Sequence, residues 1–222
     1  VPEGDDPAPE EARHGQTLAW MIADLACETP GHCPVQVTRA LAMPRRIDPD
    51  TGRPVFSPTG GSFGLLSDVS DALWAEARRY RDDLRLAALG QKAAGLVPAR
   101  VVVISAFGFE NEPGSSVCDD APSASTDRAV QAMHQAYEAS ACLGMLHVSA
   151  AGNSNGGARP EGGLLCPARW DHAVRPTQAR CAALWGAAEW AQIEQDHAAL
   201  FAAKYKGEAA ELFLPHQAGK ET

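Results

Sequence analysis

The sequence predicts an α/β fold built on a doubly wound, mostly parallel sheet that is incomplete in this chain and is followed by a C-terminal helical insertion. Two apolar runs, 99–109 and 143–153, have the length and composition of buried parallel strands, and the first is rich in β-branched residues. Each follows a stretch with helical spacing, and such alternation is typical of sheets covered by helices. After residue 175 the chain becomes Ala-rich and keeps a helical pattern.

The 222 residues are enough for one sizeable domain with its own core. Residues 1–12 are rich in proline and acidic side chains, so we expect a loose lead-in there. Residues 13–175 hold every strand pattern and form the expected α/β core portion. Residues 176–222 are expected to be a helical insertion or a processed C-terminal segment that packs on the body or covers a cleft.

The first expected helix begins at His14. Leu18, Met21, Ile22 and Leu25 follow at positions i, i+3, i+4 and i+7, which places them along one helix face. The sequence therefore predicts an amphipathic helix with His14 at its N-terminus.

A strand and a loop are expected next. Residues 33–44 alternate between apolar and polar side chains as a half-buried strand does, and Pro44 ends the pattern. Residues 45–62 are dense in proline, glycine and aspartate, which predicts a loop.

Two further helices are expected. Ser67 and Asp68 are N-cap residue types and open a long amphipathic pattern that closes at Gly90. Residues 125–142 form a second such pattern between the two apolar runs. From the strand at 33–44 onward, these elements predict the order strand, helix, strand, helix, strand, with ligands bound at the carboxyl ends of the strands.

Composition excludes two classes of partner. The net charge of −9 and the lack of a large basic cluster argue against nucleic acid, because phosphate binding needs clustered Lys and Arg. No apolar run approaches the roughly 18 residues of a membrane-spanning helix, so no membrane span is expected.

The six cysteines are an even number and suit disulfides in an oxidising compartment, although buried free thiols are an open alternative. We therefore expect a secreted or periplasmic bacterial protein. No C-x-x-C pair exists, so a zinc site is not expected.

Ser154 stands in the Gly-x-Ser-x-Gly pattern "GNSNG", which is typical of an α/β-hydrolase nucleophile. Asp171 or Asp196 and His172 or His197 follow in the order that an esterase triad would need. The nucleophile elbow requires a helix directly after the serine, yet "NGGARPEGG" cannot be helical. An esterase that uses Ser154 is therefore an alternative rather than the main hypothesis.

His14 and Asn153 form a second pair of candidates. A histidine at a helix start beside Gly15 can act as a general base reachable from solvent. An asparagine amide at a strand end can donate to a developing oxyanion, a contact whose loss costs about 3–4 kcal/mol in the transition state.

Four segments, "HGQTLAWMIADL", "RVVVISAFG", "SAAGNSNG" and "LLCPARWDHAV", resemble motifs of the subtilisin-like serine peptidases and follow in family order across residues 13–175. The resemblance implies a subtilisin-like fold and serine endopeptidase chemistry, with His14 as general base and Asn153 as oxyanion donor. It further implies that substrate-binding cleft walls for an extended peptide or protein substrate are formed by Phe107, Gly108, Ala150, Ala151 and Gly152. Gln16 and Thr17 depart from the usual residues after His-Gly, but neither belongs to the acid-base pair.

The family's catalytic serine, in Gly-Thr-Ser, and its aspartate have no counterpart here. Ser154 is the last serine, and only 13 residues precede His14. We therefore expect the Asp and Ser of the triad outside this chain, in a second chain or in another segment of the same precursor. The alternative is a non-catalytic binding or structural module, a pseudoenzyme on the same fold.

No metal or other cofactor is expected. Calcium is common in the family, but "CETPGHC" replaces the usual loop after the helix that carries the histidine, and a Cys27–Cys33 disulfide could stabilise that turn instead. The acidic segment 118–127 leaves calcium open as an alternative.

Overall fold

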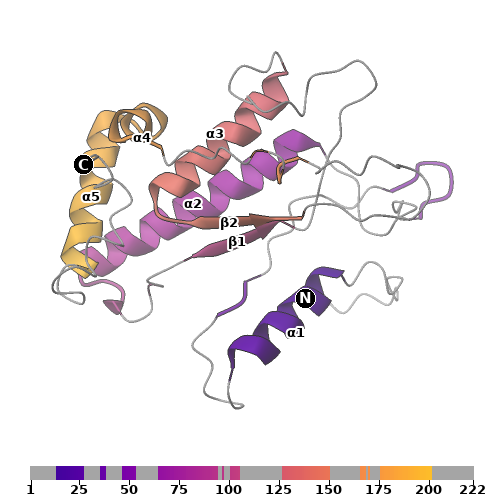
Figure 1. Cartoon of the computed structure of the whole chain (residues 1–222), viewed down its shortest axis with the longest axis horizontal. Helices are drawn as coiled ribbons and strands as arrows, with labels where there is room; N and C mark the ends of the chain where they lie inside the picture. The colour runs from indigo at the N-terminus through magenta and orange to yellow at the C-terminus, as the bar shows by residue number, and fades with distance from the viewer. Residues whose placement is uncertain are drawn as a thin grey trace. The chain divides into compact units, whose positions relative to one another are not determined.

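The computed structural model describes residues 14–27, 36–38, 47–53, 65–94, 97, 101–105, 127–150, 166–168, 170 and 176–201. The chain divides into two compact units, residues 1–72 and 73–222, with the boundary inside helix α2. The elements, labelled in Figure 1, are α1 (His14–Ala26), α2 (Leu66–Ala88), β1 (Val102–Ser105), α3 (Arg128–Cys142), β2 (Leu146–Ser149), α4 (Gln178–Trp185) and α5 (Ala187–Phe201).

Helix α1 begins at His14, as the spacing of its apolar residues predicts. Leu18 and Ile22 are half-buried, whereas Met21 and Leu25 are exposed, Leu25 to 86%. Of the strand predicted at 33–44 the structure describes residues 36–38, and these are exposed and carry no strand, so the prediction is wrong there. Alternation alone does not make a strand without a partner that accepts its backbone hydrogen bonds.

Helix α2 starts and ends through two local signals. The Asp68 carboxylate accepts a hydrogen bond from the Leu65 N–H at 2.9 Å, so Asp68 caps the helix from its third position. At the other end Gly90 has a φ of 71°, and the Gln91 N–H donates to the Leu86 carbonyl at 2.8 Å. This is a Schellman ending, and it confirms the predicted end at Gly90.

Strands β1 and β2 are parallel and are joined through α3. Val102 pairs with Leu146, and Ser105 pairs with Ser149. Asp127 caps α3 by accepting from the Ala129 N–H at 2.7 Å. The unit confirms the predicted strand, helix, strand order, because the described structure combines helices with a two-stranded parallel sheet.

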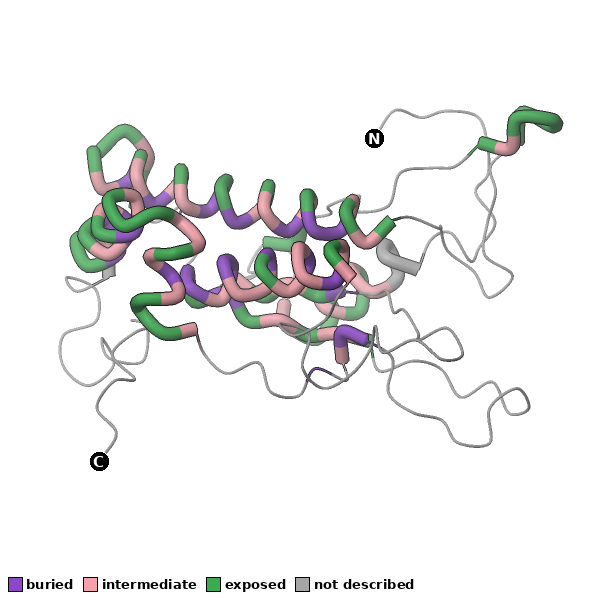
Figure 2. Tube along the Cα trace, turned by 90° about the horizontal axis from the view of Figure 1, so that it is seen from above, coloured by how far each residue is buried: buried purple, intermediate pink, exposed green. Residues whose placement is uncertain are grey.

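The core of the second unit is formed by side chains from α2, α3, α4 and α5 together with residues that precede the two strands. It contains Ala77, Tyr80, Leu84, Ala87, Val97, Cys142, Leu143, Met145, Cys181, Trp190 and Ile193. In Figure 2 the buried positions of these helices face the neighbouring helices, and the exposed positions face outward. Helices α4 and α5 therefore share one core with the strand, helix, strand unit.

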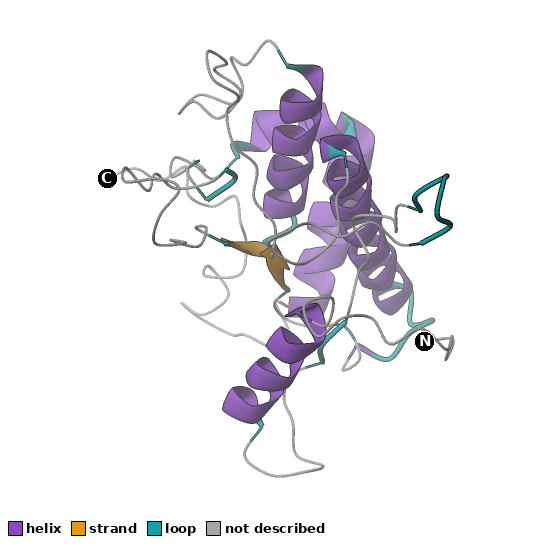
Figure 3. Ribbon diagram, turned by 90° about the vertical axis from the view of Figure 1, so that its right-hand side faces the viewer, coloured by secondary structure: helices purple, strands orange, loops and turns teal. Residues whose placement is uncertain are grey.

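The two faces of the small sheet differ. Val103 packs against the core, whereas Val102 and Leu146 on the opposite face are 51% and 61% exposed. Figure 3 shows the two strands at one side of the helices of this unit. The described residues thus cover one face of the sheet. The apolar run at 99–109 had predicted a strand that is buried on both faces.

Helix α4 is fixed to the end of α3. A disulfide joins Cys142 to Cys181 with a Cα–Cα distance of 5.7 Å, and the Trp185 indole N–H donates to the Ala139 carbonyl at 3.0 Å. Helix α5 is joined to α2, because Arg85 of α2 donates to Asp196 of α5 at 3.2 Å. The described part of the C-terminal segment therefore packs on the helix layer near the end of the sheet where the strands begin.

Candidate functional site

The carboxyl ends of β1 and β2 lie side by side. The Leu146 N–H donates to the Val101 carbonyl at 2.9 Å where the strands begin, and the Ala150 N–H donates to the Ser105 carbonyl at 3.0 Å where they end. Ala150 itself is exposed. Because Phe107 follows Ser105 by two residues, both candidate cleft segments depart from one edge of the sheet.

Several candidate residues cannot be placed more closely. Asn153, Ser154, Phe107, Gly108, Ala151 and Gly152 lie outside the described residues, as do Asp171 and His172. The backbone of His14 opens α1, but its side chain is not among those described. The structure therefore brings Ala150 to the β1 end and leaves the pairing of His14 with Asn153 a prediction.

A cluster of polar side chains lies directly beneath the strand ends, between the sheet and α3. The Tyr137 hydroxyl of α3 is 2.9 Å from the Ser105 hydroxyl of β1. The Ser149 side chain of β2 also hydrogen-bonds to Tyr137. Burial raises the pKa of Tyr137, and the two serine hydrogen bonds offset part of that rise.

His147 continues this cluster along β2. Its Nε2 is 2.7 Å from the Ser140 hydroxyl, which also lies 2.9 Å from the Ala136 carbonyl of α3. Among the described residues no group hydrogen-bonds to its buried Nδ1. Burial lowers the pKa of His147 to about 4, so the ring is neutral at pH 7.

Ser140 and His147 do not form a nucleophilic pair. Ser140 is fully buried and a substrate cannot reach it, and its hydroxyl is directed at helix carbonyls. The contact instead attaches the middle of β2 to α3.

The segment at 166–170 returns to the same helix. Trp170 is buried and meets the rings of His134 and Tyr137 edge to face, with centroids 5.8 and 6.1 Å away. Its backbone N–H donates to the Pro167 carbonyl at 2.9 Å, which closes a turn. Trp170, which follows the candidate oxyanion segment in the chain, therefore packs on the side of α3 that carries Tyr137.

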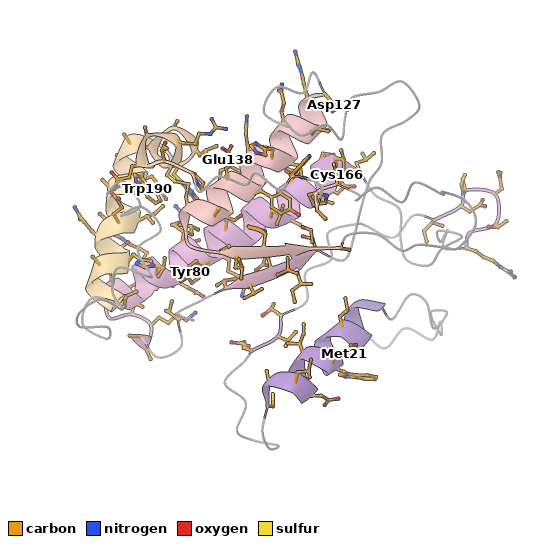
Figure 4. All side chains as sticks on the ribbon, viewed as in Figure 1. Met21, Tyr80, Asp127, Glu138, Cys166 and Trp190 are labelled. Atoms are coloured by element: carbon orange, nitrogen blue, oxygen red, sulfur yellow. A yellow bond between two sulfur atoms is a disulfide. The ribbon has the colours of Figure 1, made fainter. Side chains whose placement is uncertain are left out.

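A charged cluster around Glu138, which Figure 4 labels, joins α3 to α4. Glu138 accepts from Arg180 of α4 at 2.6 Å and lies 3.5 Å from His134 Nδ1. Burial lowers the pKa of His134, and the Glu138 charge opposes that shift. Its contacts join α3 to α4.

Asp196 and His197, which the esterase alternative uses, lie within the packing of the helices. Both are buried on α5, and Asp196 accepts from Gln192 at 2.8 Å as well as from Arg85. Burial lowers the pKa of His197 to about 4. Because α5 packs near the beginnings of the strands, these two residues lie at the end of the sheet opposite to Ala150.

Within the described residues no group of three or more His, Cys, Asp or Glu side chains could hold a metal ion. Asp127, the described residue of the acidic segment 118–127, uses one carboxylate oxygen to cap α3. In the described part of the chain no helix has the length and apolarity needed to cross a membrane.

No protein-family model, curated protein or solved structure matches this chain.

The cluster around Tyr137 is not among the sites that the sequence predicts. Ser105, His147 and Ser149 interrupt otherwise apolar strand patterns, and these interruptions are the signal that could have drawn attention to it. Tyr137 lies 32 residues from Ser105, so their contact depends on the fold rather than on local spacing.

Proposed function

We propose that this chain supplies part of a subtilisin-like serine endopeptidase, with His14 as the general base and Asn153 as the oxyanion donor. The Asp and Ser of the triad come from residues outside this chain, in a second polypeptide or another segment of the same precursor. The substrate is an extended peptide or protein segment. The sheet in the complete enzyme is the larger, doubly wound one that the resemblance implies.

The observation that carries this proposal is the pairing of the strand ends. The Ala150 N–H bonds to the Ser105 carbonyl, so the segments holding Gly152–Asn153 and Phe107–Gly108 start next to each other. Two extended segments that start at neighbouring carboxyl ends can bind a peptide between them through backbone hydrogen bonds. This is the arrangement that an oxyanion donor and a cleft wall require.

The helix start at His14 supports the role of the base. The position presents the residue at the end of α1 rather than in its middle, where neighbouring turns would flank it. A neutral histidine there can take the serine proton during attack and return it to the leaving amine. Asn153 would donate its amide N–H to the oxygen that gains negative charge in the same step.

The disulfides support an oxidising compartment. Cys142 and Cys181 are bonded to each other, and Cys27 and Cys166 are also disulfide-bonded, with partners outside the described residues. Bonds of this kind persist in secreted and periplasmic proteins. We therefore place the enzyme outside the cytoplasm, and we retain Cys27–Cys33 as the expected pair.

The test combines intact mass with a fluorophosphonate probe, which labels activated serines. The native protein, purified from its source, is expected to contain further polypeptide, covalent or tightly bound, with the probe on a serine in Gly-Thr-Ser. Changing His14→Ala in the native protein should abolish labelling, because the serine loses its base. Ser154→Ala is the matched control and should label normally.

Two results would replace the proposal by its alternatives. A homogeneous species of 23.4 kDa that takes no label would indicate a non-catalytic binding module. A label on Ser154 itself, lost in Ser154→Ala, would indicate an esterase.

A further inference from the structure

We propose that Tyr137 is a positioning residue whose hydroxyl holds the carboxyl ends of β1 and β2 together beneath the candidate cleft. The clamp is a property of the strand, helix, strand unit alone. Its consequence for catalysis rests on the proposed function.

The geometry joins one helix residue to the last residue of each strand. Ser105 ends β1, Ser149 ends β2, and the two are register partners. The Tyr137 hydroxyl lies 2.9 Å from the Ser105 hydroxyl and also hydrogen-bonds with Ser149. A phenol can donate one hydrogen bond and accept another, so this one hydroxyl can bridge both strands.

The Tyr137 ring is held in place by its neighbours. The His147 ring lies 4.5 Å from it and the Trp170 ring 6.1 Å, measured between centroids. The Ser140–His147 contact fixes the first of these rings to α3. The hydroxyl is therefore delivered to the strand ends by a rigid side chain.

The polar side chains between the sheet and α3 are unusual for this kind of interface. The face of a parallel sheet that packs on a helix is ordinarily apolar, and a buried hydroxyl costs free energy unless it is hydrogen-bonded. Ser105 is buried, and it meets Tyr137 rather than an apolar side chain. The polar contacts occur at the strand ends, whereas Val103, two residues earlier, packs against the apolar core.

The strand ends are where such support has most effect. Each strand has four residues, and the bond from the Ala150 N–H to the Ser105 carbonyl lies at the carboxyl end of the pair. Short strands open from their ends, because terminal bonds lack a neighbour on one side. Asn153 follows three residues later, so the spacing at Ser105 and Ser149 sets the origin of the candidate oxyanion segment.

Amide hydrogen exchange in the full chain tests the clamp directly. Tyr137→Phe removes only the hydroxyl and should speed exchange at the Ala150 amide about fivefold, the effect of losing one net hydrogen bond. The Leu146 amide, at the other end of the same strand pair, should change less than about twofold. Ser105→Ala should reproduce the effect, and the double variant should add little to it.

Tyr80→Phe is the matched control, since Tyr80 is a buried tyrosine on α2 in the core of the same unit. It should leave the ratio of the Ala150 and Leu146 exchange rates unchanged. The clamp is overturned if Tyr137→Phe leaves the Ala150 amide unaffected or speeds both amides equally, because the second result indicates general destabilisation.

Peptide hydrolysis by the native enzyme tests the catalytic consequence. Tyr137→Phe should lower kcat roughly tenfold while KM changes less than about twofold, because a displaced oxyanion donor affects the transition state more than substrate binding. An unchanged kcat together with faster exchange at Ala150 overturns the positioning role. A wild-type enzyme that cleaves no peptide overturns the proposed function, and the exchange comparison still decides the clamp.

Discussion

Glu138 on α3 and Arg180 on α4 form a two-point ion pair beside the disulfide that joins the same helices. Arg180 Nη2 is 2.6 Å from Glu138 Oε2, and its Nε is 3.2 Å from Oε1. The hydrogen bonds to Glu138 raise the pKa of Arg180. Covalent and ionic contacts thus fix α4 to α3 within one short stretch.

The ion pair should contribute measurably to stability. A double-mutant cycle with Glu138→Gln and Arg180→Met should give a coupling free energy of about 1 kcal/mol in urea unfolding, because the contact is bidentate and partly shielded from water. Glu76 and Arg79 on α2 form a more exposed pair and serve as the control, with an expected coupling below about 0.5 kcal/mol. Equal coupling for the two pairs would contradict this account.

The Cys142–Cys181 disulfide should stabilise the second unit more strongly than the ion pair. It closes a loop with a sequence separation of 39 residues. Restricting an unfolded loop of that length corresponds to about 4 kcal/mol. The double variant Cys142→Ala, Cys181→Ala should lower the free energy of unfolding by that order, measured with urea. A loss below about 1 kcal/mol would show that packing alone holds α4 in place.

The stability of the protein should fall between pH 6.5 and pH 4. Burial lowers the pKa of His147 and of His197 from 6.5 to about 4, so in this window the unfolded chain binds protons that the folded chain does not. Stability from both residues is therefore complete above pH 6.5 and is lost as the pH falls towards 4. Each residue accounts for up to about 3 kcal/mol.

Urea unfolding at pH 7 and pH 4.5 measures this effect. His147→Gln keeps a polar partner for Ser140 but does not titrate, so its loss of stability across the window should be smaller than that of the wild type by about 2–3 kcal/mol. An identical fall in the variant would mean that His147 is accessible to protons in the folded state.

Much of the described fold could be predicted because local signals agree with the tertiary structure. The helix start at His14 and the helix end at Gly90 depend on spacing and residue type within a few positions. The β1 run was recognisable from its β-branched composition, and the β2 run from its apolar character after a helical pattern. These elements need no knowledge of distant residues.

The remainder depends on contacts between distant residues. At residues 36–38 alternating side chains suggested a strand that did not form, because a strand requires a pairing partner. Six cysteines allow 15 pairings, so Cys142–Cys181 could not be deduced from the sequence. The Tyr137–Ser105 contact likewise depends on the register of two strands, which no local pattern specifies.

The candidate site likewise has one part that the sequence predicted and the structure confirms, and one part that stays a prediction. Adjacent strand ends follow from the strand, helix, strand pattern, and the Ala150–Ser105 bond confirms that adjacency. The roles of His14 and Asn153 come from resemblance and remain predictions.

The effect of Asn153 on peptide hydrolysis tests the central claim most directly. Asn153→Ala and Asn153→Asp, made in the native enzyme and assayed on a peptide amide, should each lower kcat about 10²–10³-fold, because both remove the amide donor to the oxyanion. KM should change little, since the contact strengthens only in the transition state. A kcat within twofold of the wild type in both variants, or a native protein that cleaves no peptide amide, would contradict the account.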